Sequence, residues 1–545
     1  MIAPFKFLNN PHVDSFSLMI SRLINSGMLK SCGFFKKNEN TALNRKDHEE
    51  NAKTKLKGSS DNEEFKLTPL SANDDVKRPV GRPVEHSAFY KLKLLLIYTF
   101  TGAVTLGNFF SMPISKACSV HKTVVYDFIS NQRHNWKKLL LMVATKAIGM
   151  VKTEQNEESF SALICDDSNI HRRRAKHVEL SARNFDHVEG KNTKGFLMMP
   201  ISWTNGDVTL PCNLSLISSS KTQNVICQKK EGIDNRTIGG KRRLQATTNK
   251  TDVVVDLVKE CLDQGISAKY FMTDSWFTCI NQLVLDIYNL GLDYIGMDKN
   301  FSQYYLYNGE KYHLNDLKQF MVSEPHCTNK DILGHTAVKI PPCVKKAKKM
   351  TAEEYNTACI HAKIVWLKAR GSKDKVIAIL CTDLSLSDEE VIRYYSARFN
   401  IEFGFFDMKH FLNLESGSRA TNYDSVFCHV TMACIQLIIM TLLKFFNEDN
   451  KTIGTLYRET TDSFRVKPLA DLIQKIVTMV TELPDKMIAK GYIVKGKERE
   501  FARDVLLQLK SILKGISLYV ADFILDTIDK VQSQFKSLVS YAKTS

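Results

Sequence analysis

The spacing of apolar positions changes near residue 160, and this change divides the chain into regions of different structure. Residues 85–150 carry apolar side chains at helical spacing. From Phe160 onward, three apolar runs of strand length follow one another, with turn residues at 204–207 between the last two: SALICDD, GFLMMPISW and VTLPCNLSLIS. These runs predict a three-stranded antiparallel meander.

Helices and strands alternate after the meander. A helical pattern covers Thr251–Gln264, the short strand AKYFMTD ends at Asp274, and a helix from about 278 to 290 leads to the strand LDYIGMD. The order βββ-α-β-α-β predicts an α/β fold with a ribonuclease-H-like catalytic core. Residues 299–387 interrupt this plan, and their runs AKIVWLKAR and KVIAILCTD predict a β-rich insertion domain.

The two ends of the chain differ from this core. Residues 36–66 have almost nothing to bury and predict a flexible linker. The following KRPVGRP, at 77–83, is either a minor-groove-binding AT-hook or the end of a Pro-rich linker. Residues after 467 are helical in pattern and are a candidate dimer surface.

The predicted domains are 1–84 (N-terminal segment and linker), 85–150 (helical DNA-binding region), 151–298 (first part of the core), 299–387 (insertion), 388–460 (catalytic helix part) and 461–545 (helical C-terminal region).

Within 85–150, one stretch has the pattern of helix, short turn and helix. Residues 119–121 form the predicted turn and Lys122–Ser130 the second helix, with Val124, Val125 and Phe128 directed inward. A helix-turn-helix would place this second helix in a DNA major groove. An ordinary helical hairpin has the same pattern, so both interpretations are open.

Charge favours a polyanionic partner. The 545 residues include 75 Lys and Arg against 59 Asp and Glu, which gives a net charge of +16. The most apolar run, Val430–Leu443, is short for a bilayer and contains Gln436, so it predicts a buried helix rather than a membrane span. The N-terminus lacks a signal-peptide pattern, and the thirteen cysteines form no C-x-x-C pair. We therefore expect a cytoplasmic, DNA-associated protein without a membrane.

One segment, VIRYYSARFNIEFGFFDMKHFL, carries the most informative chemistry. Its offsets of 0, 3, 7 and 14 place four functional groups within about 60° of one helix face: Tyr395, Arg398, Glu402 and Lys409. A solvated charged face is the ordinary explanation, but buried charge needs a partner or a function. Four apolar neighbours predict burial of much of this helix: Ile401, Phe403, Phe405 and Phe406.

Three carboxylates are predicted to converge. Asp166 ends the first strand, Asp274 ends the fourth, and in a ribonuclease-H-like sheet these strands are neighbours with the Glu402 helix beside them. Oxygen ligands suit Mg²⁺ or Mn²⁺, and two ions about 4 Å apart support in-line displacement at phosphorus. Asp167 competes with Asp166, because alternation along a strand sends the two to opposite sides. Asp166 is favoured because it directly follows the buried run at 162–165.

These residues resemble a known family. The three acids and the motif Tyr-x2-Arg-x3-Glu-x6-Lys are similar to the DDE transposases of bacterial insertion sequences, IS-four group, over about residues 85–460. The resemblance implies metal-dependent DNA cleavage at transposon ends and strand transfer into target DNA. It also implies two Mg²⁺ or Mn²⁺ ions, terminal inverted repeats and target DNA as partners, and a homodimer in a synaptic complex. The implied metal ligands are Asp166, Asp274 and Glu402, and the implied phosphate contacts are Tyr395, Arg398 and Lys409.

Further DNA contacts are suggested less directly. By the same resemblance, Trp366 would stack on a flipped base, although a core tryptophan is an equal interpretation. Basic runs either contact the phosphate backbone of DNA or form solvated loops. Their arginines are Arg172, Arg173, Arg174, Arg242 and Arg243. Two other functions share these features, namely a catalytically silent transposase-derived DNA-binding protein and a ribonuclease-H-like nuclease.

Overall fold

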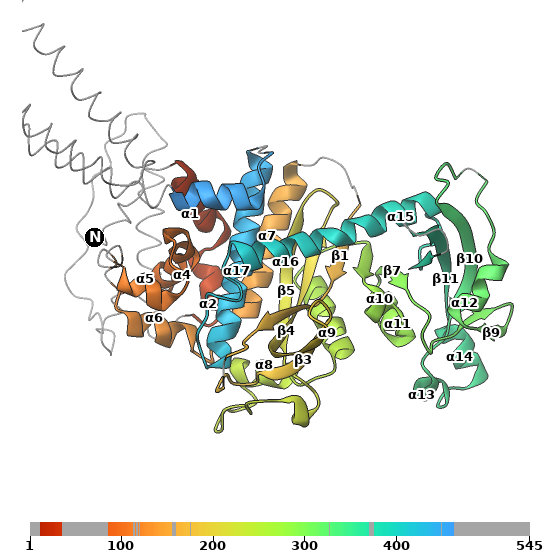
Figure 1. Ribbon diagram of the computed structural model, residues 1–545, viewed down its shortest axis with the longest axis horizontal. Coiled ribbons are helices and arrows are strands. Elements are labelled where there is room, and N and C mark those ends of the chain that lie inside the picture. Colours follow the sequence, from red (N-terminus) through yellow and green to blue (C-terminus); the bar gives the residue numbers. More distant parts are fainter. Residues whose placement is uncertain are drawn as a thin grey trace, which may run out of the picture. The chain divides into compact units, whose positions relative to one another are not determined.

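The computed structural model describes residues 11–34, 86–112, 115, 118, 120–154, 160–174, 176–325, 327–369, 375–447 and 450–462 (Figure 1). The KRPVGRP segment, the predicted linker and the predicted C-terminal helices lie outside the described residues.

The chain divides into two compact units. One comprises Met1–Phe16, Phe100–Gly102 and Thr455–Ser545, and the other Ser17–Thr99 and Ala103–Gly454. The fold and site below belong to the second unit.

The predicted meander and the two strands after it form the centre of the sheet. Strand β1 (Ala162–Cys165) is antiparallel to β4 (Lys191–Thr204), which is antiparallel to β5 (Thr209–Ile217). On its other side β1 is parallel to β6 (Tyr270–Thr273), which is parallel to β7 (Asp293–Asp298). The prediction that the first and fourth predicted strands are neighbours is confirmed. Every residue of β1 and β6 is buried, which explains their continuous apolar runs.

Two short polar strands extend the meander and were not predicted. Strands β2 (Ser168–His171) and β3 (Ala182–Asp186) both pair with the first half of β4. They meet at Gly195, where φ is +156° and an added Cβ would lie 2.0 Å from the Ile170 carbonyl oxygen. A glycine is therefore required for this close approach.

The strands of residues 299–387 do not form a separate sheet. Strand β12 (Val376–Cys381) pairs with β7, and β11 (Ile360–Lys368), β10 (Ile332–Ile340), β8 (Tyr305–Tyr307) and β9 (Glu310–Tyr312) follow in order. The β-rich content of this region is as predicted. Its strands continue the core sheet, which has twelve strands among the described residues.

Helices cover the core sheet (Figure 1). Helix α7 (Trp136–Glu154) and α17 (Tyr423–Phe446) pack on each other and on β5, and α9 (Lys250–Asp263) packs on β4 and β5. By length and composition α17 is the described helix that could cross a membrane, yet 83% of its apolar window is buried inside the protein. Its Gln436 donates hydrogen bonds to the Leu96 carbonyl and Thr99 hydroxyl. The predicted buried core helix is thus confirmed, with longer bounds.

The helical N-terminal region matches its prediction in outline. Helix α6 (Lys122–Ile129) follows α5 (Leu106–Ser111), and Val125 and Phe128 are buried. Val124 was expected to point inward but is 38% exposed, because the core covers only the side of this helix that carries Val125, Phe128 and Ile129. The other helices are α1 (Pro11–Leu23), α2 (Ser26–Ser31), α4 (Ala88–Ile97), η1 (Tyr98–Thr101), η3 (Thr222–Asn224), α8 (Ile238–Gln245), α10 (Ser275–Thr278), α11 (Asn281–Tyr288), α12 (Leu314–Leu317), η4 (Lys318–Phe320), α13 (Val344–Ala347) and α14 (Ala352–Ala358).

The motif helix consists of three consecutive segments. Helix α15 (Asp388–Ser396) contacts β7, β10 and β12, a 3-10 turn η5 (Ala397–Phe399) follows, and α16 (Asn400–His410) contacts β5 and α17 (Figure 1). The Ser387 hydroxyl caps the start in a capping box with Glu390. This helix therefore connects the β10–β12 region to the core.

Burial of the motif helix is one-sided. Ile401 and Phe405 are buried as predicted, but Phe403 is 67% and Phe406 52% exposed. The prediction of burial was wrong for these two side chains, which are three positions apart and so lie on one exposed side of α16.

Candidate active site

Two of the predicted acids emerge side by side from the sheet. In the parallel pairing of β1 with β6, Cys165 lies opposite Thr273. Asp166 and Asp274 directly follow these residues, so both leave the sheet at the same edge. Asp274 also caps α10, since its Oδ1 accepts a hydrogen bond from the Trp276 amide at 3.1 Å. This cap fixes the carboxylate at the strand end.

Arg398 connects this edge to the motif helix. Its Nη1 donates to Asp166 Oδ2 at 3.1 Å, and its Nη2 donates to Glu402 Oε1 at 2.8 Å. Arg398 is only 5% exposed, whereas the Glu402 side chain is 51% exposed. One guanidinium thus joins a strand-end acid to the helix acid, and it brings Asp166, Glu402 and Arg398 together as predicted residues of one site.

Burial makes ionisation of the two aspartates at the sheet edge unfavourable. Burial raises the pKa of Asp166 to about 7, Arg398 opposes this, and Asp274 adds to it. Burial also raises the pKa of Asp274, and the nearby Asp167 carboxylate adds to that shift. Such shifts mean that the ionised carboxylates need an additional cation nearby, which is the situation expected of a metal-binding site.

Tyr395 lies against the same guanidinium. It is 7% exposed, and its ring centroid is 5.8 Å from the Arg398 guanidinium carbon. Burial raises the pKa of Tyr395 to about 12, so the phenol remains a hydrogen-bond donor at neutral pH. Its hydroxyl has no hydrogen-bond partner of good geometry among the described residues. A donor of this kind is suited to an oxygen atom of a bound phosphate.

Lys409, the last residue of the motif, is not bonded to these acids. Its Nζ lies 3.6 Å from Glu415 Oε1, and the same oxygen is 2.9 Å from His171 Nδ1 on β2. Seven residues separate Lys409 from Glu402, which is about 10 Å along a helix. The predicted four-residue face is therefore divided between the acid cluster and the end of β2.

Asp166 and Asp167 have different partners, as alternation along the strand predicts. Asp167 Oδ2 forms a salt bridge with Lys250 Nζ at the start of α9. The Lys250 ammonium also lies 3.9 Å from the ring centroid of Trp276. Asp166 is the aspartate linked through Arg398 to Glu402, which favours it as the first ligand, although Asp167 acts electrostatically on Asp274.

The donor set fits a hard divalent cation, but the acids are spread apart in this structure. Among the described residues, the His, Cys, Asp and Glu group whose ligand atoms all lie within 4.8 Å of one another is His171, Asp186 and Glu189. The three predicted acids are not such a group, because Arg398 stands between Asp166 and Glu402. The half-exposed Glu402 side chain would have to rotate for all three to share ions.

Three of the predicted DNA-contacting arginines are buried, so this part of the prediction is wrong. Arg243 is 2% exposed and bridges Glu179 at 2.6 Å and Asp424 at 2.8 Å, and Arg242 also pairs with Asp424. Arg172 is 7% exposed and donates to the Glu415 carbonyl oxygen at 2.7 Å. These guanidinium groups are used inside the protein and are closed to a DNA backbone.

The other two arginines are at the surface. The Arg173 side chain is 50% exposed and pairs with Glu189, and Arg174 is exposed. For these two residues, contact with DNA stays a prediction.

Trp366 is also a core residue. It is 3% exposed, it pairs across the sheet with Gly334 and Ala378, and its indole donates to Thr336 Oγ1 at 2.9 Å. The prediction that it stacks on a flipped base is wrong for this structure, because both of its faces are covered. The alternative of a core tryptophan holds.

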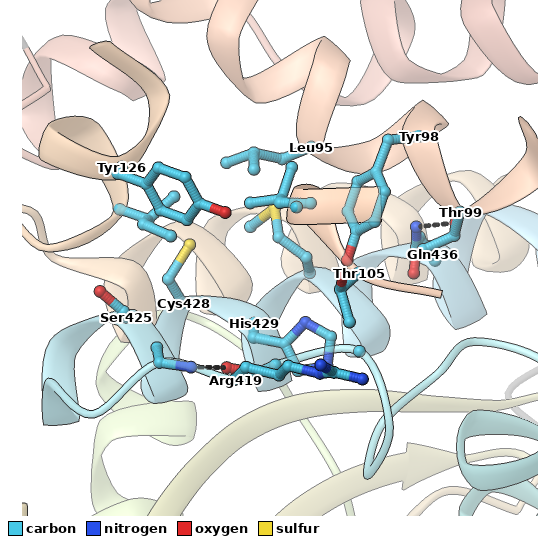
Figure 2. Close-up of a pocket in the computed structure, with 17 residues that line it drawn as sticks. Leu95, Tyr98, Thr99, Thr105, Tyr126, Arg419, Ser425, Cys428, His429 and Gln436 are labelled. Carbon is cyan, nitrogen blue, oxygen red and sulfur yellow. Dashed lines mark hydrogen bonds between the residues drawn. The ribbon is translucent and has the colours of Figure 1, made fainter. Parts of the chain in front are cut away.

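A cavity of about 200 Å³ lies between the N-terminal helices and α17. Figure 2 shows His429 and Arg419 at its lower side and Tyr126 and Leu95 above them. Burial lowers the pKa of His429 to about 4, so its ring is neutral at physiological pH. None of the predicted site residues lines this cavity.

One family model matches part of the chain. Residues 112–306 match the family described as DDE superfamily endonuclease. This segment contains Asp166 and Asp274, while Glu402 lies beyond it. Residues 112–306 are thus similar to a DDE superfamily endonuclease.

Among solved structures, the chain is similar to the cryo-EM structure of a piggyBac transposase synaptic complex with hairpin DNA. The two share 14% identity with a TM-score of 0.33, over 69% of this chain and 71% of that one. No curated protein matches the chain.

Proposed function

We propose that this protein is a DDE transposase with a ribonuclease-H-like core, which cleaves DNA at the ends of a mobile element and joins them to target DNA. The observation that carries the proposal is the Arg398 bridge between Asp166 and Glu402, with Asp274 on the neighbouring strand. The match of residues 112–306 to a DDE endonuclease domain supports it independently. The finer assignment to the IS-four group rests on the Tyr-x2-Arg-x3-Glu-x6-Lys spacing.

Asp166, Asp274 and Glu402 would hold the divalent ions, Mg²⁺ or Mn²⁺. When bound, two such ions supply Lewis-acid stabilisation of the attacking and leaving oxygens. The strand-end position of the two aspartates and the cap on Asp274 hold these carboxylates in fixed places. Burial is the main cause of the raised pKa of Asp166 and of Asp274, neighbouring carboxylates add to it, and a bound divalent cation would favour the ionised forms.

The cationic and phenolic groups of the motif would position the DNA strand. The Arg398 fork occupies Asp166 and Glu402 in this structure, and once cations balance these acids it becomes available to a phosphate. Tyr395 would donate its unused hydroxyl to a second phosphate oxygen. Lys409 would contact the backbone further along, where α16 reaches β2. The partners would be terminal inverted repeats and target DNA, bound by a homodimer in the bacterial cytoplasm.

The test is cleavage of a labelled duplex that carries the element's own end sequence. We expect wild-type protein to cut it with Mg²⁺ or Mn²⁺ and not with EDTA, and Glu402→Gln to lose at least about a hundredfold in rate, since even groups supporting metal ligands contribute 10–100-fold. Binding of the duplex should change little. The matched control is Glu353→Gln, an exposed acid on α14, which should cut normally. Normal cleavage by Glu402→Gln would refute the role of Glu402.

A strand-transfer assay distinguishes the proposed transposase from the two alternative functions. A labelled 3′-OH end DNA incubated with plasmid should become joined to the plasmid. Cleavage without joining would indicate a ribonuclease-H-like nuclease, and DNA binding without cleavage a catalytically silent DNA-binding protein.

A further inference from the structure

Trp276 differs from the other tryptophans of the chain. The chain has four, and Trp136, Trp203 and Trp366 are 0%, 1% and 3% exposed. Trp276 is 44% exposed, and it follows Asp274 by two positions on α10. Its exposure beside the acid cluster places an aromatic ring where it can contact a molecule bound to those acids.

The ring of Trp276 is held in a fixed orientation. The Lys250 ammonium lies 3.9 Å from its centroid, and the same ammonium is anchored by Asp167. Phe277 meets the indole edge-on, with centroids 4.9 Å apart and an interplanar angle of 89°. The Trp276 amide is bonded to Asp274 at 3.1 Å. A side chain that is already ordered loses little further entropy when a flat ligand stacks on it.

Two features of the surroundings indicate which flat ligand would fit. The neighbouring acids are the proposed site of phosphodiester cleavage, so a DNA strand would pass close to the indole. Lys250 supplies a cation over one face of the ring, and this cation matches the phosphate that accompanies every base. An aromatic platform next to a cation is the usual means by which proteins bind unpaired bases without sequence preference.

We propose that Trp276 stacks on an unpaired base of the DNA strand at the active site, and that Lys250 contacts the adjoining phosphate. The inference rests on the proposed function, because that function brings DNA to these acids. It assigns to Trp276 the base-stacking role that the buried Trp366 does not fill. Stacking on an indole offsets the unfavourable free energy of removing a base from the duplex.

The test uses the full chain in EDTA, so that no cleavage is needed, with dT15 as single strand and dT15·dA15 as duplex. Because the other three tryptophans are buried, we expect dT15 to quench the emission of Trp276 in a saturable way. Trp276→Leu should lose this quenching and bind dT15 about tenfold more weakly, as expected for one stacked base. Its affinity for the duplex should stay within about twofold of wild type, since phosphate contacts dominate there.

Two further variants keep the result interpretable. Trp276→Phe retains a ring and should keep most of the dT15 affinity. Tyr288→Leu, at an exposed aromatic on α11, should bind like wild type. The inference is overturned if wild-type emission does not respond to dT15, if Trp276→Leu binds dT15 normally, or if it loses single strand and duplex equally. Because no step here requires cleavage, these outcomes are distinct from failure of the proposed transposase activity.

Discussion

Two clusters of acids and arginines in this protein have similar composition and opposite character. In the acid cluster, Asp166 and Glu402 share the guanidinium of Arg398, and Asp274 lies at the end of the neighbouring strand. Burial raises the pKa of Asp166 to about 7 there. A second group, the buried ion-pair network, consists of Glu179, Arg242, Arg243 and Asp424.

The charges of the buried ion-pair network are balanced, because two guanidinium groups face two carboxylates. Burial by itself would raise the pKa of Glu179, but hydrogen bonds from Arg243 and from the Lys230 and Tyr423 amides outweigh it, and the pKa is lowered. Asp424 is fully buried, whereas the Glu402 side chain is half exposed. In a balanced and enclosed set every charge has a partner, and losing one partner is costly, whereas a half-exposed acid such as Glu402 is accessible to a cation.

The largest effect is expected on stability, from a change in the buried ion-pair network. Asp424→Asn removes the shared partner of Arg242 and Arg243, and leaving buried charges unpaired should lower the free energy of unfolding by about 3–5 kcal/mol. Urea denaturation followed by circular dichroism measures this. The control, Asp286→Asn, breaks a surface ion pair with Lys346 and should change stability by at most about 1 kcal/mol. Equal effects in both variants would contradict the distinction.

The next effect concerns the bridge in the acid cluster. Arg398→Lys keeps the positive charge but removes the fork that joins Asp166 to Glu402. We expect DNA cleavage to fall about 10–100-fold, the usual loss when a group that supports metal ligands is changed. Single-turnover cleavage of end DNA is the measurement. An unchanged rate would show that Arg398 has no positioning role.

The smallest effect is expected at the surface. Arg174→Gln should weaken duplex binding slightly and reduce the slope of log affinity against log salt by about 1, as for one lost phosphate contact. Fluorescence anisotropy at several salt concentrations measures the slope. An unchanged slope would leave Arg174 as a solvated loop residue, and Arg173 would be the one exposed arginine of the three that could still contact DNA.

The sequence predicted the elements that carry the strongest local signal. The continuous apolar runs of β1 and β6 located Asp166 and Asp274, because each acid directly follows a fully buried strand. The polar strands β2 and β3 were missed, since they exist only through pairing with β4. The faces of α16 were misjudged because a run of phenylalanines does not reveal which side the core covers, and Phe403 is exposed.

Long-range partners explain the remaining errors about the site. Arg242 and Arg243 were expected on a surface, and their burial depends on Asp424, which lies far along the chain. Trp366 and Trp276 could not be ranked from sequence, because burial depends on the neighbouring strands in one case and on α9 in the other. A tryptophan two positions after a strand-end acid was the available signal for Trp276.

The central claim is that Asp166, Asp274 and Glu402 together hold the ions that cut DNA. The most direct measurement is Mn²⁺ binding, followed by electron paramagnetic resonance, to the full chain in complex with its end DNA. We predict that Asp166→Asn, Asp274→Asn and Glu402→Gln each remove bound Mn²⁺, and that Glu189→Gln, in the group around His171, leaves it unchanged. Undiminished Mn²⁺ binding in the three variants, or its loss in Glu189→Gln alone, would contradict the account.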